Sequence, residues 1–149
     1  LVGPILMGFG LFGMTWLAPQ RQVGGDHAGE SIWVYNAAAF FIPWCIVAAI
    51  LAFARGWDRE RPLLMHCYAG ISRSTAAAYI AACALMPERD EDELAQALRA
   101  ASPSATPNAL LVAIADGMLG REGRMSAAIA AIGRGAEAFE GEHFHLSVT

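Results

Sequence analysis

A short turn between two apolar segments constrains the fold of this chain most. Residues 62–65 (Pro-Leu-Leu-Met) are typical of a short buried strand, and the alanine-rich residues 74–85 are typical of a helix. The turn between them runs from Cys67 to Arg73 and contains Gly70. A strand followed directly by a helix predicts an α/β fold, in which helices flank a parallel sheet.

The residue types in this turn indicate an anion-binding site. A tight turn with a glycine directs successive backbone N–H groups into one concavity, and the next helix adds the positive end of its dipole. The planar guanidinium of Arg73 suits two phosphate oxygens at once. The same positive field lowers the pKa of Cys67 and favours its thiolate. A cysteine without such neighbours is usually a small core residue, which is our interpretation of Cys45 and Cys83.

Nine residues, His66-Cys67-Tyr68-Ala69-Gly70-Ile71-Ser72-Arg73-Ser74, resemble the His-Cys-x5-Arg-Ser/Thr signature of the protein tyrosine and dual-specificity phosphatases. Residues 75–125 are similar to the helical half of small bacterial members, so the resemblance covers roughly residues 50–149. It implies a phosphatase-type parallel sheet. It also implies hydrolysis of phosphomonoesters, above all phosphotyrosine, through a phosphocysteine and without a cofactor or a metal.

The resemblance assigns a role to each residue of the signature. Cys67 attacks phosphorus, and Arg73 with the loop N–H groups holds the phosphoryl oxygens. Ser74 assists breakdown of the phosphocysteine, or it simply caps the helix. His66 tunes the thiolate by hydrogen bonding. The expected substrate-binding residues are Tyr68, Ala69, Gly70, Ile71, Ser72 and Arg73, although Ser72 also fits a plain loop hydroxyl.

A general acid is missing where the resemblance would place it. Dual-specificity phosphatases carry an aspartate well before the cysteine, but residues 34–38 here contain no carboxylate. Asp26 and Glu30 are the nearest upstream acids and fit a solvated loop. Asp58 is a poor candidate, because it precedes the expected loop strand at its far end. The nucleophile and the phosphate cradle are therefore predicted, but turnover is left in question.

Charge is distributed unevenly along the chain. Between residues 1 and 54 the only formal charges lie in the polar break 19–31, which separates the apolar runs Leu1–Ala18 and Ala37–Ala54. Eighteen helical residues span about 27 Å, close to the thickness of a bilayer core. One interpretation is a transmembrane helical hairpin over residues 1–54, anchored in the inner membrane, with a cytoplasmic phosphatase-like domain over 55–149. The other is that residues 1–54 belong to a buried core, with a central strand at 31–35.

Composition and charge narrow the possible partners, the cellular compartment and the kinds of site. The formal charge of −4 and the lack of a basic run argue against nucleic acid as a partner. Three widely spaced cysteines do not form a disulfide framework, and a working thiolate needs a reducing compartment, which favours the cytosol. His27, His143 and His145 are scattered and do not suggest a metal site. The expected partners are a phosphorylated protein or a small aryl phosphate.

The C-terminal half predicts four helices. They cover residues 74–86, a segment from the N-cap Asp90 to Ala101, a segment from the cap Thr106 to Gly120, and residues 125–132. If both apolar runs are membrane helices, only one strand remains, and one strand cannot form a sheet. Two alternatives to an enzyme therefore stay open: a membrane-anchored, phosphate-binding pseudophosphatase without turnover, and a membrane protein whose second half is an inert passenger.

Overall fold

The computed structural model describes residues 28–148, with side chains from residue 39 onward. By its internal contacts the chain divides into two compact units, Leu1–Ala39 and Phe40–Thr149. The described part of the first unit is the beginning of helix α2 (Ala28–Arg55). The signature loop and every other candidate site residue lie in the second unit. Whether the functional division falls between residues 54 and 55, as the sequence suggests, stays a prediction.

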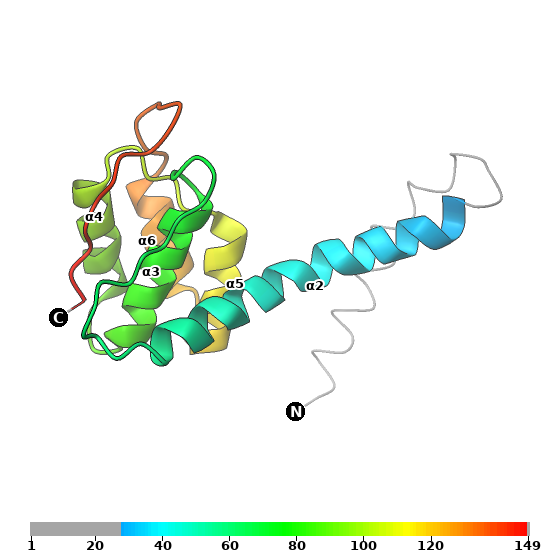
Figure 1. The fold of residues 1–149 in the computed structure, drawn as a ribbon, viewed down its shortest axis with the longest axis horizontal. Helices are drawn as coiled ribbons and strands as arrows, with labels where there is room; N and C mark the ends of the chain where they lie inside the picture. The colour runs from blue at the N-terminus through cyan, green and yellow to red at the C-terminus, as the bar shows by residue number, and fades with distance from the viewer. Residues whose placement is uncertain (1–27, 149) are drawn as a thin grey trace. The chain divides into compact units, whose positions relative to one another are not determined.

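The second unit is built from helices that enclose one core (Figure 1). After α2 come α3 (Arg73–Leu85), α4 (Glu91–Ala101), α5 (Ala109–Leu119) and α6 (Arg124–Ile132). Helix α3 packs against α4 and α5, and these two helices pack in turn against α6. The largest fully buried side chains of the unit are Tyr79, Ile80, Leu94, Leu98, Met125, Val47, Val112, Thr75 and Cys83.

The predicted α/β fold with a parallel sheet is wrong for the described residues, which form helices and contain no strand. Residues 62–65 belong to no helix or strand, but their exposure alternates as in a strand: Leu63 and Met65 are half-buried and Leu64 is exposed. A strand also needs a neighbour that completes its hydrogen-bond ladder, and none pairs with this segment in the described structure. The alternative central strand at residues 31–35 lies inside α2.

The expected transmembrane hairpin also requires correction. None of the helices described here combines the length and the apolar character needed to cross a bilayer. The apolar run 37–54 lies within α2, which includes Pro43. The other run, Leu1–Ala18, lies outside the described residues.

The ends of α4 and α5 can be compared with the capping residues predicted from the sequence. Asp90 caps α4 as expected, with its carboxylate accepting from the N–H groups of Asp92 and Glu93. Gly120 ends α5 in the left-handed conformation, also as expected. The predicted cap Thr106 is wrong, because Asn108 is the N-cap of α5 and accepts from Leu111 N–H at 3.1 Å.

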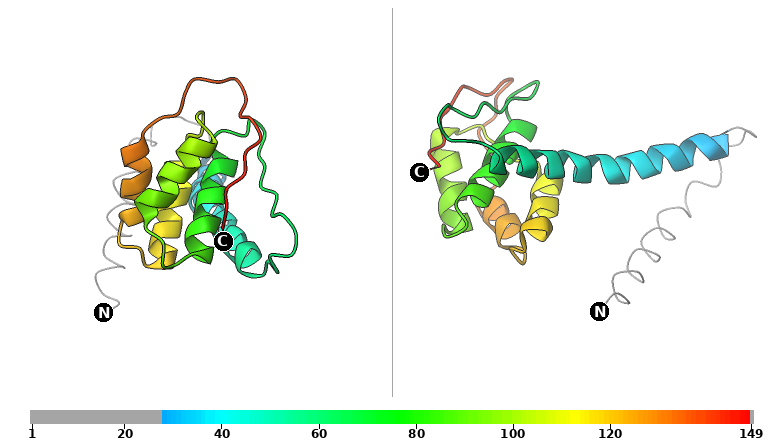
Figure 2. Two further views of the ribbon diagram at one scale, coloured as in Figure 1. Left: turned by 90° about the vertical axis from the view of Figure 1, so that its left-hand side faces the viewer. Right: turned by 60° about the horizontal axis from the view of Figure 1, so that its bottom comes forward.

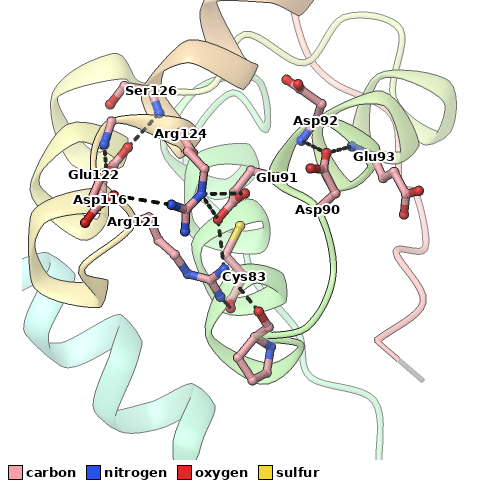
Figure 3. A network of polar contacts seen from close by, with 12 residues as sticks. Cys83, Asp90, Glu91, Asp92, Glu93, Asp116, Arg121, Glu122, Arg124 and Ser126 are labelled. Atoms are coloured by element: carbon pink, nitrogen blue, oxygen red, sulfur yellow. Dashed lines mark hydrogen bonds and ion pairs between the residues drawn. The ribbon is translucent and has the colours of Figure 1, made fainter.

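A buried ionic cluster ties α3, α4 and α6 together at the end of α3 away from the signature loop (Figure 3). Glu91 is 4 % exposed, and its carboxylate lies 2.8 Å from Arg121 Nη1 and 3.2 Å from Arg124 Nε. Arg121 Nη2 donates to the carbonyl of Cys83 at 2.8 Å. Burial raises the pKa of Glu91, but hydrogen bonds and the two arginines outweigh it and hold this pKa below its usual range. The carboxylate is therefore part of the fold and not a candidate catalytic group.

Candidate active site

The signature residues form a loop that leads directly into α3. Cys67 follows the irregular segment 62–66, and the helix begins at Arg73 with Ser72 as its N-cap residue. Gly70 adopts φ 71°, a left-handed conformation that L side chains rarely take, so the turn depends on glycine here. Ser74 is the second residue of the helix and therefore does not cap it, which removes that alternative for its hydroxyl.

The Cys67 thiol is surrounded by hydrogen-bond donors. Its Sγ lies 3.3 Å from the Oγ of Ser74, the contact that the phosphatase resemblance implies. Partial burial raises the pKa of Cys67, but hydrogen bonds from the Ser74 hydroxyl and from the backbone N–H groups of Ser74, Gly70 and Arg73 outweigh it. The net effect lowers the pKa of Cys67 to about 6. A thiol with this pKa is mostly thiolate at neutral pH, the form that acts as a nucleophile.

The second half of the loop is held from outside by carbonyl contacts. The carbonyl of Ile71 accepts from Thr106 N–H at 2.9 Å and from the buried hydroxyl of Thr75 at 2.5 Å. The carbonyl of Ser72 accepts from Asn108 N–H at 3.2 Å. When carbonyls are engaged on the outside, the N–H groups of the same turn are left to face the thiol.

The first half of the loop is held by the segment that follows α6. Gly141 N–H donates to the carbonyl of Ala69 at 2.8 Å. A Cβ atom on Gly141 would lie 2.7 Å from the Gly70 carbonyl oxygen, so only glycine fits at this contact. Upstream, Gly135 N–H donates to the Thr106 hydroxyl at 3.1 Å, and Ala136 N–H donates to the Pro103 carbonyl at 2.9 Å. We call residues 134–142 the C-terminal strap.

Three other predicted site residues are exposed. The guanidinium of Arg73 makes no hydrogen bond or ion pair with any described residue, which leaves it available to an anion. The ring of Tyr68 is 98 % exposed beside the thiol-bearing residue. His66 is exposed and forms no hydrogen bond with the Cys67 thiol in the part of the chain that the structure describes, so its tuning role stays a prediction.

The residues that hold the loop from outside were missed by sequence reasoning. Thr75 follows the signature directly, and a hydroxyl one turn into a helix could have suggested a bond back to the loop. Thr106 was singled out only as a helix cap, and Asn108 was not singled out at all. Gly141 lies 74 residues after Cys67 in a segment without periodicity, and a single glycine there gives no signal of its contact with the loop.

A separate pocket of about 460 Å³ lies between α5 and α6. Its walls are mainly apolar, with Pro107, Val112 and Ile129 among the lining residues, and it contains none of residues 66–74. This pocket is therefore separate from the Cys67 loop.

Comparison with known proteins gives no independent identification of this site. No protein-family model, no curated protein and no solved structure matches the chain. Any functional proposal therefore rests on the geometry of the loop.

Proposed function

We propose that this chain is a cysteine-dependent phosphomonoester hydrolase that acts on aryl phosphates, phosphotyrosine in a protein above all. The observation that carries the proposal is the Cys67 thiol, whose pKa is lowered to about 6 by donors from Ser74, Gly70 and Arg73. Donors that stabilise a thiolate also suit the oxygens of a bound phosphoryl group. The start of α3 adds the positive end of its dipole to the same concavity.

In this mechanism the Cys67 thiolate attacks phosphorus, and the S–P bond forms as the bond to the leaving oxygen breaks. The loop N–H groups and the Arg73 guanidinium carry the negative charge of the transferring phosphoryl group. Ser74 Oγ, at 3.3 Å from the sulfur, stabilises the departing thiolate when water cleaves the phosphocysteine. The loop donors and the guanidinium stabilise charge on their own, so the proposed reaction requires no cofactor, and the thiolate requires a reducing compartment.

Two features support an aryl substrate. The phenol ring of Tyr68 is 98 % exposed, one residue from the nucleophile, and can flank a flat aromatic group. Arg73 is exposed at the start of α3 and can bind two phosphate oxygens in its planar fork. A phosphorylated tyrosine side chain offers both an aromatic ring and a dianion.

The decisive test is hydrolysis of p-nitrophenyl phosphate by the wild-type chain and by Cys67→Ser. We expect hydrolysis by the wild type and none above background by the variant, because a hydroxyl at this position lacks the lowered pKa of the thiol. Cys83→Ser is the matched control: its thiol is buried in the core and burial raises its pKa to about 12. Equal hydrolysis by wild type and Cys67→Ser would rule out the nucleophile assignment.

A second candidate function is recognition of phosphorylated partners without turnover. It is favoured by one observation: among the described residues, no carboxylate forms a hydrogen bond with a residue of the loop 67–73. In that case inorganic phosphate or vanadate should raise the melting temperature of the chain, and Arg73→Ala should abolish the rise, while no substrate is hydrolysed. Turnover that depends on Cys67 would exclude this candidate.

A further inference from the structure

The apolar pocket between α5 and α6 plays no part in the chemistry proposed for Cys67. The two helices follow each other in the chain and pack side by side, yellow and orange in Figure 2. The walls of the pocket come from residues 109–113 of α5, residues 126–130 of α6 and the segments next to them, and its volume is about 460 Å³. Sites for small organic molecules typically measure about 300–1,000 Å³, so this pocket is large enough for one.

Most of the pocket wall is hydrocarbon. The apolar side chains that line it are Pro107, Ala109, Val112, Ala113, Ile129 and Ala130. The hydroxyl of Thr106, which also lines the pocket, is already engaged: it accepts from Gly135 N–H at 3.1 Å and donates to the Ser104 carbonyl at 3.4 Å. A wall of this kind suits a hydrocarbon chain better than a sugar or a nucleotide.

Arg134 gives the pocket a single positive charge. Among the described residues that line the pocket, it is the only charged one. It is exposed, one residue after Gly133, which caps the end of α6. Its guanidinium makes no hydrogen bond or ion pair with any described residue, so no contact holds it away from a molecule in the pocket. The fork of a guanidinium matches a carboxylate, and one positive charge balances a monoanion.

The backbone on both sides of Arg134 is held by the fold. Arg99 Nη2 donates to the carbonyl of Gly133 at 2.7 Å, and Gly135 N–H donates to the Thr106 hydroxyl. Thr106 is fixed in turn, because its own N–H donates to the Ile71 carbonyl at 2.9 Å. This rim of the pocket is therefore formed without a ligand, which lowers the cost of binding one.

We propose that this pocket binds a free fatty carboxylate of about ten carbons, a size that suits its volume. The hydrocarbon chain lies along the apolar wall between α5 and α6, and the carboxylate lies on the guanidinium of Arg134. The chain leaves water for an apolar surface, while the two charges stay at the exposed rim and keep much of their hydration. The site shares no residue with the signature 66–74, and the proposal does not depend on phosphatase activity.

The test is isothermal titration calorimetry of the full chain with decanoate at concentrations where it is monomeric. We expect saturable binding of one molecule per chain. Hexanoate lacks four of the methylene groups of decanoate, and affinity should fall by about two- to fourfold for each methylene removed, because less apolar surface is buried. Decanol has the same chain without the charge and should also bind.

The role of Arg134 is tested by comparing the charged and the neutral ligand. Arg134→Gln should weaken the binding of decanoate by about fivefold, the upper range for an exposed ion pair, and leave the binding of decanol unchanged. Arg61→Gln removes the charge of another exposed arginine that does not line the pocket, and it should change neither affinity.

The position of the ligand is tested with two neighbouring alanines of α6, both exposed. Ala130 lines the pocket and Ala131 does not. Ala130→Trp should weaken the binding of both ligands by about tenfold or more, because close-packed groups cannot share one space. Ala131→Trp should bind both like the wild type. Ala113→Trp fills the pocket from α5 and gives the same test if Ala130→Trp fails to fold by circular dichroism.

The proposal is wrong if decanoate shows no saturable binding, or if the variant with a filled pocket and Ala131→Trp bind it equally well. It is also wrong if Arg134→Gln weakens decanoate and decanol to the same extent, or weakens neither. The same titrations can be run on Cys67→Ser, where unchanged binding is expected, so their result is separate from the proposed hydrolysis.

Discussion

At the scale of single residues, Cys67 and Cys83 show how surroundings set the behaviour of identical side chains. Cys83 is fully buried in α3, and desolvation raises the pKa of its thiol to about 12. Cys67 is partly buried, yet the hydroxyl and N–H donors around it bring the pKa of its thiol to about 6. Near neutral pH the first thiol is therefore inert and the second is reactive.

The thiol of Cys67 can be titrated by its rate of alkylation with iodoacetamide. In a Cys45→Ser, Cys83→Ser background we expect the rate to rise with pH through a midpoint near the Cys67 pKa of about 6. Ser74→Ala removes the strongest single donor and should move the midpoint up by about one to two pH units, since a hydrogen bond to a charged group contributes about 1.5–3 kcal/mol. A midpoint near 8.5 in both proteins, the ordinary value for cysteine, would contradict the proposed thiolate.

At the scale of elements, the connection between α4 and α5 both caps a helix and holds the loop. The Asn108 side chain accepts from Leu111 N–H, while its own backbone N–H donates to the Ser72 carbonyl. The start of α5 and the start of α3 are thereby fixed to each other. A capping residue at this point contributes to stability through its side chain and to the site through its backbone.

Asn108→Ala should destabilise the chain by about 1 kcal/mol, because the N–H groups of the first turn of α5 lose their side-chain acceptor. The melting temperature should fall by roughly 3–5 °C. Asn108→Asp is the conservative control, since a carboxylate also accepts from Leu111 N–H and suits the helix dipole. If Asn108→Ala and Asn108→Asp have the same melting temperature, the side chain of Asn108 does not cap the helix.

Local sequence patterns predicted helix ends correctly at Asp90 and Gly120, but they predicted a sheet that the described residues do not form. The difference has a physical reason. Asp90 and Gly120 mark helix ends through contacts within a few residues, so their signals are legible in the sequence. The segment 62–65 does have the alternating burial of a strand, but strand pairing is decided by a distant partner that no local pattern reveals. The same limit hid the approach of Gly141 to Ala69, whereas the loop itself was predictable because its chemistry is contiguous.

At the scale of the whole molecule, the buried cluster around Glu91 holds the helices together at the end opposite the site. Arg121 donates from its guanidinium to the carbonyls of Pro87 and Cys83 as well as to Glu91. The side chains of Glu91 and Arg121 are 6 % and 11 % exposed, so neither charge can return to water if its partner is lost. The buried ion pairs and the Cys67 loop thus lie at opposite ends of α3.

Glu91→Gln should be strongly destabilising, by about 3–5 kcal/mol, because it leaves the Arg121 charge buried without its counter-ion. Its pKa is lowered in the folded chain, so the stability from Glu91 is present above the usual glutamate pKa of about 4.3 and is lost as pH falls through the lower, folded value. The melting temperature should therefore fall more steeply with decreasing acid pH for the wild type than for Glu91→Gln. Glu122→Gln, which removes an exposed pair at 3.8 Å, should change little.

The bond between Gly141 and Ala69 also has a consequence for biosynthesis. A ribosome makes Cys67 long before it makes Gly141, since 74 residues separate them. A nascent chain would therefore carry the Cys67 thiol before the backbone group that bonds its loop has been made.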